Sequence, residues 1–173
     1  MDHVTLLAED GSAVGTLPKD QVHTFETPLH LAFSCHIRDR AGRILVTRRA
    51  LAKQTWPGVW TNSFCGHPRP GEDMIDAVRR RAVEELGIHL DDVSLALPEY
   101  RYRAVDASGI VENEICPVHI ASVDADPVAN PDEVSEWAWA DADQLVDAVA
   151  AAPFAFSPWL REQLPLLRAI GKV

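Results

Sequence analysis

The stretch that decides the fold is residues 66–88, which read GHPRPGEDMIDAVRRRAVEELGI. Glycine and proline make its first part a loop, and apolar residues recur at helical spacing in its second part. This spacing predicts a helix over Glu72–Leu86, with a buried stripe centred between Val78 and Leu86. Gly87 follows at the position of a C-terminal cap, where a helix ends.

Two glutamates lie in the last turn of this helix. At about 100° per residue, Glu85 falls roughly 60° from the centre of the buried stripe, whereas Glu84 lies nearly opposite. A carboxylate at the edge of a buried face is a candidate ligand for Mg²⁺, which prefers one or two carboxylates together with phosphate oxygens. We therefore predict a Mg²⁺ site at Glu85 and a solvated surface position for Glu84.

Strand-like segments lie on both sides of the helix. They are Val4–Ala8, Leu29–Ile37, Arg43–Arg48, Thr61–Gly66, Glu99–Val105, Ile110–Ile120 and Val134–Ala140. Two further helices are predicted over Asp141–Ala151 and from Ser157 to near Gly171. Strands interleaved with a few helices indicate the α+β class, with a mixed β-sheet flanked by helices on both faces. The 173 residues hold no linker or repeat, so we expect a single domain over residues 1–173.

Composition and charge argue against several classes of protein. Hydrophobic residues make up 47% of the chain and the net charge is −10, which disfavours a disordered chain, a nucleic-acid partner or an anionic membrane partner. We find no run of about 18 apolar residues and no basic-then-apolar N-terminal segment. Three cysteines do not indicate a disulfide framework. We expect a cytoplasmic monomer or weak dimer that acts on a small molecule.

Two pairs of polar residues are each spaced by two positions in strand-like stretches. Cys65 and His67 stand at the exit of one predicted strand, and Glu112 and Glu114 stand within another. Because side chains alternate across a strand, the members of each pair share a face. The four side chains are therefore candidates for a metal or catalytic site.

His23 and His30 extend this candidate donor set. They flank Pro28, which favours an extended arm over a helix. Together with His67 and the two glutamates they could form a five-ligand nitrogen and oxygen site for Zn²⁺, Mn²⁺ or Mg²⁺. Read singly, each histidine is more often a surface or hydrogen-bonded residue than a ligand.

Residues 66–88 resemble the Nudix box, a glycine–loop–glutamate–helix signature. Seven residues fall on its spacing: Gly66, Glu72, Arg80, Glu84, Glu85, Gly87 and Ile88. Arg81 departs from the pattern, because the box has its first helical glutamate there. In the hydrolases of that superfamily this glutamate belongs to the metal cluster that activates water. The resemblance therefore implies a Nudix-like α/β/α sandwich, while Arg81 weakens the case for diphosphate hydrolysis and adds a contact for an anion.

Longer segments resemble the type I isopentenyl-diphosphate isomerases. They are LHLAFS (29–34), TRRAL (47–51), WPGVWTNS (56–63), CGHP (65–68), RYR (101–103) and GIVENE (109–114). The resemblance runs from about Leu6 to Trp159, nearly the whole chain. It implies reversible conversion of isopentenyl diphosphate to dimethylallyl diphosphate through a tertiary carbocation, in isoprenoid biosynthesis.

The same resemblance implies roles for individual residues. Cys65 and Glu114 are the catalytic pair, and Tyr102 assists Glu114. One divalent metal, Mn, Zn or Mg, is held by five side chains: His23, His30, His67, Glu112 and Glu114. The substrate diphosphate is held by four cations and by a Mg²⁺ on an acidic residue: Lys19, Arg49, Lys53, Arg81 and Glu85. Residues 1–28 form an N-terminal arm that supplies some of these ligands.

Moving a double bond by one carbon requires one proton to be added and another to be removed. We expect Glu114 to give the first proton, because a carboxyl bound to a metal is more acidic than a free one. Cys65, on the opposite face of the substrate, then takes the second proton as a thiolate. Trp159 matches a tryptophan of the family, and its ring can stabilise the carbocation by about 0.5–2 kcal/mol.

Two alternatives stay open at this point. A Nudix hydrolase acting on a nucleotide or isoprenoid diphosphate would use the same helix and Mg²⁺ but would have no use for Cys65 or the histidines. A non-catalytic binding module would use Cys65 with His23, His30 and His67 as a structural zinc site. Against this module stand the two glutamates, because structural zinc sites rarely use two carboxylates.

Overall fold

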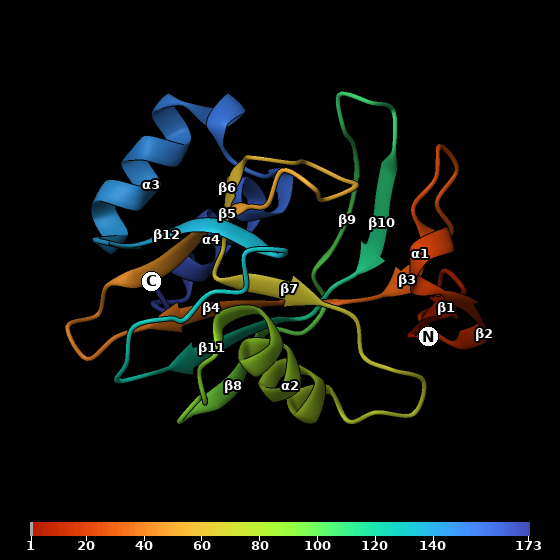
Figure 1. Ribbon diagram of the computed structural model, residues 1–173, viewed down its shortest axis with the longest axis horizontal. Coiled ribbons are helices and arrows are strands. Elements are labelled where there is room, and N and C mark those ends of the chain that lie inside the picture. Colours follow the sequence, from red (N-terminus) through yellow and green to blue (C-terminus); the bar gives the residue numbers. More distant parts are fainter. Residues whose placement is uncertain (1) are drawn as a thin grey trace.

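The computed structural model describes residues 2–173 and consists of two mixed β-sheets flanked by helices (Figure 1). The first sheet has the order β2 (Ala13–Pro18), β1 (His3–Leu7), β3 (His30–Leu31), β10 (Val111–Ile115) and β9 (Arg101–Val105). The second has the order β12 (Val134–Ala140), β5 (Ile44–Arg49), β4 (Phe33–Arg38), β11 (Val118–Ser122) and β8 (Val93–Leu97), with β6 (Trp60–Thr61) on β5 and β7 (Phe64–Gly66) on β4. The helices are α1 (Lys19–Val22), α2 (Met74–Leu86), α3 (Ala142–Ala151), a 3₁₀ turn (Pro153–Ala155) and α4 (Pro158–Ala169). No helix in residues 2–173 is long and apolar enough to cross a membrane.

Helix α2 confirms the prediction made from residues 66–88, with a start two residues later than expected. Asp73 is the N-cap, since its carboxylate accepts hydrogen bonds from two backbone N–H groups of the first turn. The helix ends at Gly87, whose φ of 64° is the left-handed conformation that glycine adopts without strain. Glu85 is buried and Glu84 is exposed, as their positions on the helix predict.

The second sheet is sandwiched between helices. Alternate residues of β4, namely Phe33, Cys35 and Ile37, pack in one apolar cluster with the buried stripe of α2. On the other face, Ile44 and Val46 of β5 pack with buried residues of α3 and α4. Figure 1 shows α2 on one side of this sheet and α3 and α4 on the other. The α+β class and the α/β/α layering are therefore confirmed.

Two predicted strands are each divided between the sheets. The segment expected as Leu29–Ile37 becomes β3 and β4, and the segment expected as Ile110–Ile120 becomes β10 and β11. Pro117 lies at the second break, where it has no N–H to continue a ladder. The segments cross together, since β3 is parallel to β10 and β4 is parallel to β11. Both chain segments therefore pass from the first sheet to the second at the same place. The pocket described below lies there, between the two sheets.

Three elements carry no sequence signal. Strand β2 is exposed along most of its length, so it has no alternation of buried and exposed residues. Edge strand β8 is likewise half exposed, and α1 has four residues. Helix α1 ends at Val22 and the chain is extended at His23, but it turns over residues 24–27, so the extended arm expected between His23 and His30 is interrupted.

His36 connects the sheet to α4 and makes stability depend on pH. Its side chain is fully buried, its Nε2 lies 2.9 Å from Gln163 Oε1, and burial lowers its pKa from 6.5 to about 4. Between these values the unfolded chain binds more protons, so stability falls as the pH falls. Relative to a His36→Gln variant, we expect the free energy of unfolding to drop by up to about 3 kcal/mol between pH 7 and pH 4, measured by urea unfolding. If the free energy of unfolding changed with pH by the same amount in both proteins, this role of His36 would be refuted.

Candidate active site

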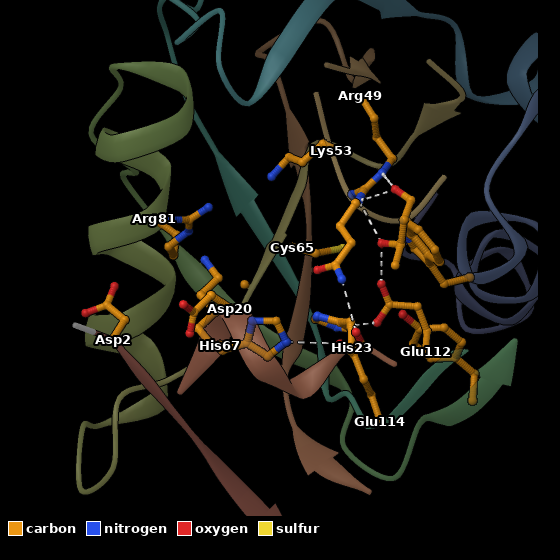
Figure 2. A pocket seen from close by; sticks show the side chains of 16 residues that line it. Asp2, Asp20, His23, Arg49, Lys53, Cys65, His67, Arg81, Glu112 and Glu114 are labelled. Carbon is orange, nitrogen blue, oxygen red and sulfur yellow. Dashed lines mark hydrogen bonds and ion pairs between the residues drawn. The ribbon is translucent and has the colours of Figure 1, made fainter. Parts of the chain in front are cut away.

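A pocket of about 450 Å³ opens where the two sheets part. Its walls contain most of the candidate residues: Lys19, His23, Arg49, Lys53, Cys65, His67, Arg81, Tyr102, Glu112, Glu114 and Trp159. Figure 2 shows how these side chains converge from several strands and from α2. Of the candidates, His30 and Glu85 do not line the pocket, although both contact residues that do.

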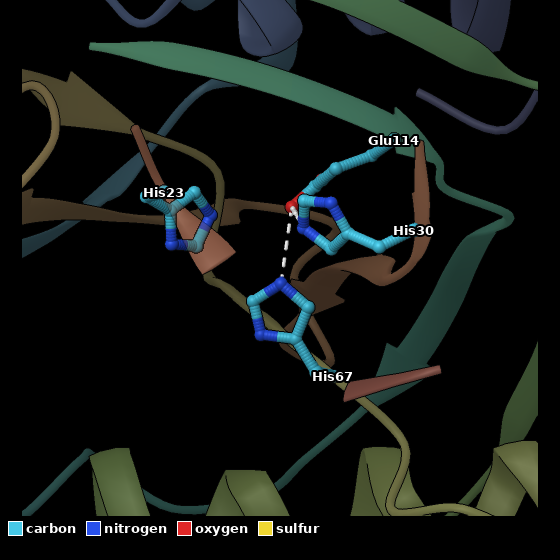
Figure 3. Close-up of side chains that lie close together, drawn as sticks. All are labelled: His23, His30, His67 and Glu114. Carbon is cyan, nitrogen blue, oxygen red and sulfur yellow. Dashed lines mark hydrogen bonds and ion pairs between the residues drawn. The ribbon is translucent and has the colours of Figure 1, made fainter. Parts of the chain in front are cut away.

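Three histidines and one glutamate gather on one side of this pocket (Figure 3). One possible ligand atom from each of His23, His30, His67 and Glu114 lies within 4.8 Å of all the others. Glu114 Oε1 is 3.3 Å from His30 Nε2 and 3.1 Å from His67 Nε2. Four of the five predicted metal ligands therefore meet in one cluster.

Backbone pairing explains how these distant residues come together. Parallel strands β3 and β10 place His30 next to Glu114, although the two are far apart in the sequence. Strand β7 pairs with β4 and ends at Gly66, so His67 leaves the sheet beside that pair. Gly66 has no room for a side chain, because a Cβ there would lie 2.8 Å from Arg81 Cγ of α2. Arg80 Nη2 then donates to the His67 carbonyl at 3.2 Å and fixes the turn.

Glu112 lies at the edge of the cluster. Its Oε2 is 2.9 Å from His23 Nε2, and its Oε1 accepts a hydrogen bond of 2.6 Å from Thr55. Glu112 and Glu114 sit two residues apart on β10, as predicted, and both side chains are buried.

The donor atoms fit a divalent cation. His23 Nε2, His30 Nε2 and Glu112 Oε2 are buried and make no hydrogen bond within residues 2–173. His30 Nδ1 lies 2.9 Å from the Pro28 carbonyl, which keeps the proton on Nδ1 and leaves Nε2 free as a ligand. Neighbouring ligands on an octahedral ion with bonds of about 2.1 Å are about 3 Å apart. The separations of 2.9–3.3 Å among these atoms match that geometry.

The protonation states of Cys65 and Glu114 follow from burial and from the cluster. Burial alone would raise the pKa of Glu114, but the adjacent imidazoles of His30 and His67 hold that pKa well below its usual range. Burial lowers the pKa of His67 to about 3, so this imidazole is neutral at pH 7. Burial raises the pKa of Cys65 to about 12. The pair is therefore a carboxylate and a thiol.

Asn62 holds two of the candidate residues and was not found from the sequence. Its Oδ1 accepts hydrogen bonds from Cys65 Sγ at 3.3 Å and from Trp159 Nε1 at 2.9 Å. Its Nδ2 donates to the carbonyls of Cys35 and Phe64, which fixes the direction of the amide. The signal available was a polar residue three positions before Cys65, which by itself carries no chemistry.

The aromatic rings of Tyr102 and Trp159 line the pocket together with Cys65 and Glu114. The Trp159 ring is 5.7 Å from the ring of Tyr102 and 5.5 Å from that of Trp56. Tyr102 is directly opposite Glu114 in the β9–β10 ladder, so the two side chains are neighbours on one face. Burial and the charges of the two glutamates raise the pKa of Tyr102 well above its usual range, so it is a neutral phenol.

Four predicted diphosphate contacts line the pocket beside this cluster. Figure 2 places Lys53, Arg81 and Arg49 around one side of the cavity. Burial and the nearby charge of Arg81 lower the pKa of Lys19. Lys53 forms an ion pair with Glu133. These cations could receive an anionic group of a ligand.

Glu85 differs from the expectation of an open ligand. It is 5% exposed, does not line the pocket, and forms an ion pair with Arg81. Charge from Glu85 and Glu133 raises the pKa of Arg81 although burial opposes this, so the guanidinium stays charged. Both contacts from Arg81 go to Oε1 of Glu85, and the role of this carboxylate as a Mg²⁺ ligand stays a prediction.

Comparison with known proteins identifies the broad family to which this chain belongs. The model of the NUDIX domain family matches residues 28–165, and the chain belongs to that family. The crystal structure of DR0079 from Deinococcus radiodurans superposes with a TM-score of 0.73 at 23% identity, covering 95% of this chain and 98% of that one. At this identity the likeness shows the fold alone.

Within this class the chain belongs to the isopentenyl-diphosphate Delta-isomerase family. A protein of that name from Clavibacter sepedonicus is 63% identical over 166 residues, 95% of this chain and 86% of the relative. Another from Leifsonia xyli subsp. xyli is 60% identical over 170 residues, 97% of this chain and 92% of the relative. The family resemblance inferred from the sequence is confirmed.

Proposed function

We propose that this chain interconverts isopentenyl diphosphate and dimethylallyl diphosphate in isoprenoid biosynthesis. The observation that carries the proposal is the presence of Cys65 and Glu114 in the walls of one small pocket, next to a cluster of cations. The names of the relatives specify the same reaction. We further propose that residues 1–173 act as one domain, of which Met1 lies outside the described residues. A cytoplasmic location and a monomeric or weakly dimeric state stay predictions.

The cluster would hold one divalent metal through side chains of the arm and of both sheets: His23, His30, His67, Glu112 and Glu114. A bound cation would lower the proton affinity of the Glu114 carboxyl. His30 and His67 already favour the ionised form of this group, so a proton on Glu114 would be given up readily. The family assignment does not specify whether this metal is Mn, Zn or Mg, so that choice belongs to the proposal. We also propose a second Mg²⁺, which Glu85 would hold together with the substrate diphosphate.

The chain's own groups would act as follows in the direction from isopentenyl to dimethylallyl diphosphate. Lys19, Arg49, Lys53 and Arg81 bind the diphosphate and so fix the position of the five-carbon chain. Glu114 adds a proton to the terminal carbon, with Tyr102 beside it, and the tertiary carbocation faces the Trp159 ring. Cys65 then removes a proton from the methylene carbon that lies next to the cationic carbon on the diphosphate side, and the new double bond forms there. The buried walls keep water from the carbocation.

The resting protonation states bear on the order of these steps. The raised pKa of Cys65 and the lowered pKa of Glu114 favour a thiol and a carboxylate, which is the state from which the reverse reaction would start. The forward reaction would start from the opposite state, with a proton on Glu114 and a thiolate at Cys65, so a reversible enzyme passes through both states. Transfer from Glu114 first, in the forward direction, stays a prediction.

The two alternatives find less support. For a hydrolase, Arg81 would occupy the position of a metal-binding glutamate, and it is paired there with Glu85. For a structural zinc site with Cys65, the sulfur would have to join the donor cluster, but the four atoms that gather come from three histidines and Glu114. Incubation with isopentenyl diphosphate and Mg²⁺ distinguishes all three. We expect dimethylallyl diphosphate without phosphate release, whereas release of phosphate would overturn the proposal.

Removal of metal should abolish activity. His23 Nε2, His30 Nε2 and Glu112 Oε2 are buried without a hydrogen bond to the described residues, so an empty cluster leaves these polar atoms unpaired and Glu114 poorly oriented. We expect dialysis against EDTA to stop isomerisation and added Mg²⁺ or Mn²⁺ to restore it, with EDTA already saturated with Mg²⁺ as the control. Full turnover in protein shown by metal analysis to hold no divalent ion would contradict this.

A further inference from the structure

The loop between β5 and β6 reaches the metal cluster through two consecutive residues. Thr55 is 3% exposed and its hydroxyl lies 2.6 Å from Glu112 Oε1. Gln54 Nε2 donates to the His23 carbonyl at 3.1 Å. The loop therefore contacts both members of the pair in which His23 Nε2 and Glu112 Oε2 face each other at 2.9 Å.

The direction of the hydrogen bond at Thr55 follows from its neighbours. A hydroxyl has one proton and can accept as well as donate. Arg49 Nη2 donates to Thr55 Oγ1 at 3.2 Å, so the hydroxyl proton points to the other neighbour, the Glu112 carboxylate. A hydroxyl that receives from a guanidinium and donates to a carboxylate forms a short, charge-assisted bond.

Arg49 also fixes the backbone of this loop. Its Nη2 donates to the Thr55 carbonyl at 2.8 Å, and its Nε donates to the Trp56 carbonyl at 3.2 Å. Trp56 has a φ of 42°, a conformation that bulky residues rarely adopt unless the surroundings impose it. Figure 2 shows the dashed contacts that run from Arg49 down to Glu112.

The bond from Thr55 determines which oxygen of Glu112 is available. Oε1 is taken by the hydroxyl, whereas Oε2 is buried and makes no hydrogen bond. Only Oε2 therefore faces the cluster, on the side of His23. Without the hydroxyl, Glu112 could rotate or turn both oxygens towards the ion, and Oε1 would lose its partner.

We propose that Thr55 is a positioning residue for the metal site, and that its hydroxyl holds Glu112 as a ligand through Oε2 alone. The inference rests on the proposed function insofar as the cluster must bind a metal. It adds a residue whose type gives no hint of this role, since a threonine in a loop is usually a solvated polar residue. Partners that orient metal ligands typically change metal affinity by about 10–100-fold when they are removed.

The test is the affinity of the full chain for Mn²⁺ alone, without substrate, measured by isothermal titration calorimetry after removal of bound metal. Thr55→Val keeps the shape of the side chain and removes the hydroxyl, and Thr55→Ser keeps the hydroxyl. We expect Thr55→Val to weaken Mn²⁺ binding by about 10–100-fold and Thr55→Ser to restore most of the affinity.

Thr47→Val is the matched control. Thr47 is 2% exposed and its hydroxyl donates to the Asn62 carbonyl at 2.9 Å, so the change removes an equally buried hydrogen bond away from Glu112. Mn²⁺ binding should be unchanged in this variant. Wild-type affinity in a folded Thr55→Val protein, or equal losses in the Val and Ser variants, would overturn the proposal.

The same proteins separate this inference from the proposed function. If wild type binds Mn²⁺ and the Thr55→Val loss is seen, but no dimethylallyl diphosphate forms, the function fails and the role of Thr55 stands. If wild type isomerises its substrate and Thr55→Val binds Mn²⁺ normally, the function stands and the role of Thr55 fails.

Discussion

Replacing Cys65 by alanine should lower kcat for isomerisation by about 10²–10⁴-fold, because one of the two proton transfers loses its group. KM should change little, since the cations that would hold the diphosphate come from other residues. The expected readout is dimethylallyl diphosphate formation over time. Mn²⁺ binding should also persist, because the sulfur is not among the four clustered donor atoms.

Cys35→Ala is the control for this variant. Cys35 is fully buried on β4, whereas Cys65 is only partly buried, and Cys35 packs in the apolar cluster under α2 and does not line the pocket. Its loss should cost some stability and leave kcat near the wild-type value. If Cys65→Ala retained full kcat, the thiol would have no part in the proton transfer. If it lost bound metal instead, the structural zinc alternative would regain support.

Replacing Glu114 by glutamine should have the largest effect of all, a loss of about 10⁴-fold or more in kcat/KM, because it removes a metal ligand and a proton-transferring group together. Oε1 of Glu114 contacts both His30 and His67, so the neutral amide would also leave the cluster without its central charge. We therefore expect weak or absent Mn²⁺ binding in the same protein. Turnover and titration calorimetry on one preparation measure both effects.

Two further variants sharpen this result. Glu99→Gln changes an exposed glutamate outside the pocket and should leave both turnover and Mn²⁺ binding intact. Glu114→Asp keeps the charge but shortens the side chain, so it should recover metal binding better than it recovers turnover. A Glu114→Gln protein with normal kcat would show that the carboxylate neither holds the metal nor moves a proton.

Local patterns were sufficient to predict helix α2, the capping glycine and the burial of Glu85 against the exposure of Glu84. Each of these depends on residues within a few positions of one another, so periodicity reports them directly. The same reasoning placed Cys65 with His67 and Glu112 with Glu114. Glu112 and Glu114 share strand β10, whereas His67 follows directly after β7, which carries Cys65, and alternation along a strand is also a local property.

The contact between His30 and Glu114 could not be derived in this way. It depends on the parallel pairing of β3 with β10, and that pairing depends on where two long predicted strands break and change sheets. Periodicity alone made each of them one strand. The resemblance to a known family supplied the grouping of ligands that spacing could only suggest.

Thr55 and Asn62 were missed for a different reason. Both act through neutral groups that orient other side chains, and nothing in their type or spacing separates them from ordinary polar residues. Their importance lies in the directions of hydrogen bonds, which only coordinates specify. The ion pair between Arg81 and Glu85 was likewise not expected. Glu85 was predicted to be a metal ligand, and in the structure its carboxylate contacts the Arg81 guanidinium.

The central claim is that two side chains facing one pocket add and remove protons on an alkene. Incubation of the metal-loaded protein with isopentenyl diphosphate in D₂O tests it most directly, with the product examined by mass spectrometry and NMR. The account predicts dimethylallyl diphosphate that carries deuterium at the carbon protonated by Glu114, with the diphosphate intact. An unlabelled allylic product, or phosphate without any allylic product, would contradict it.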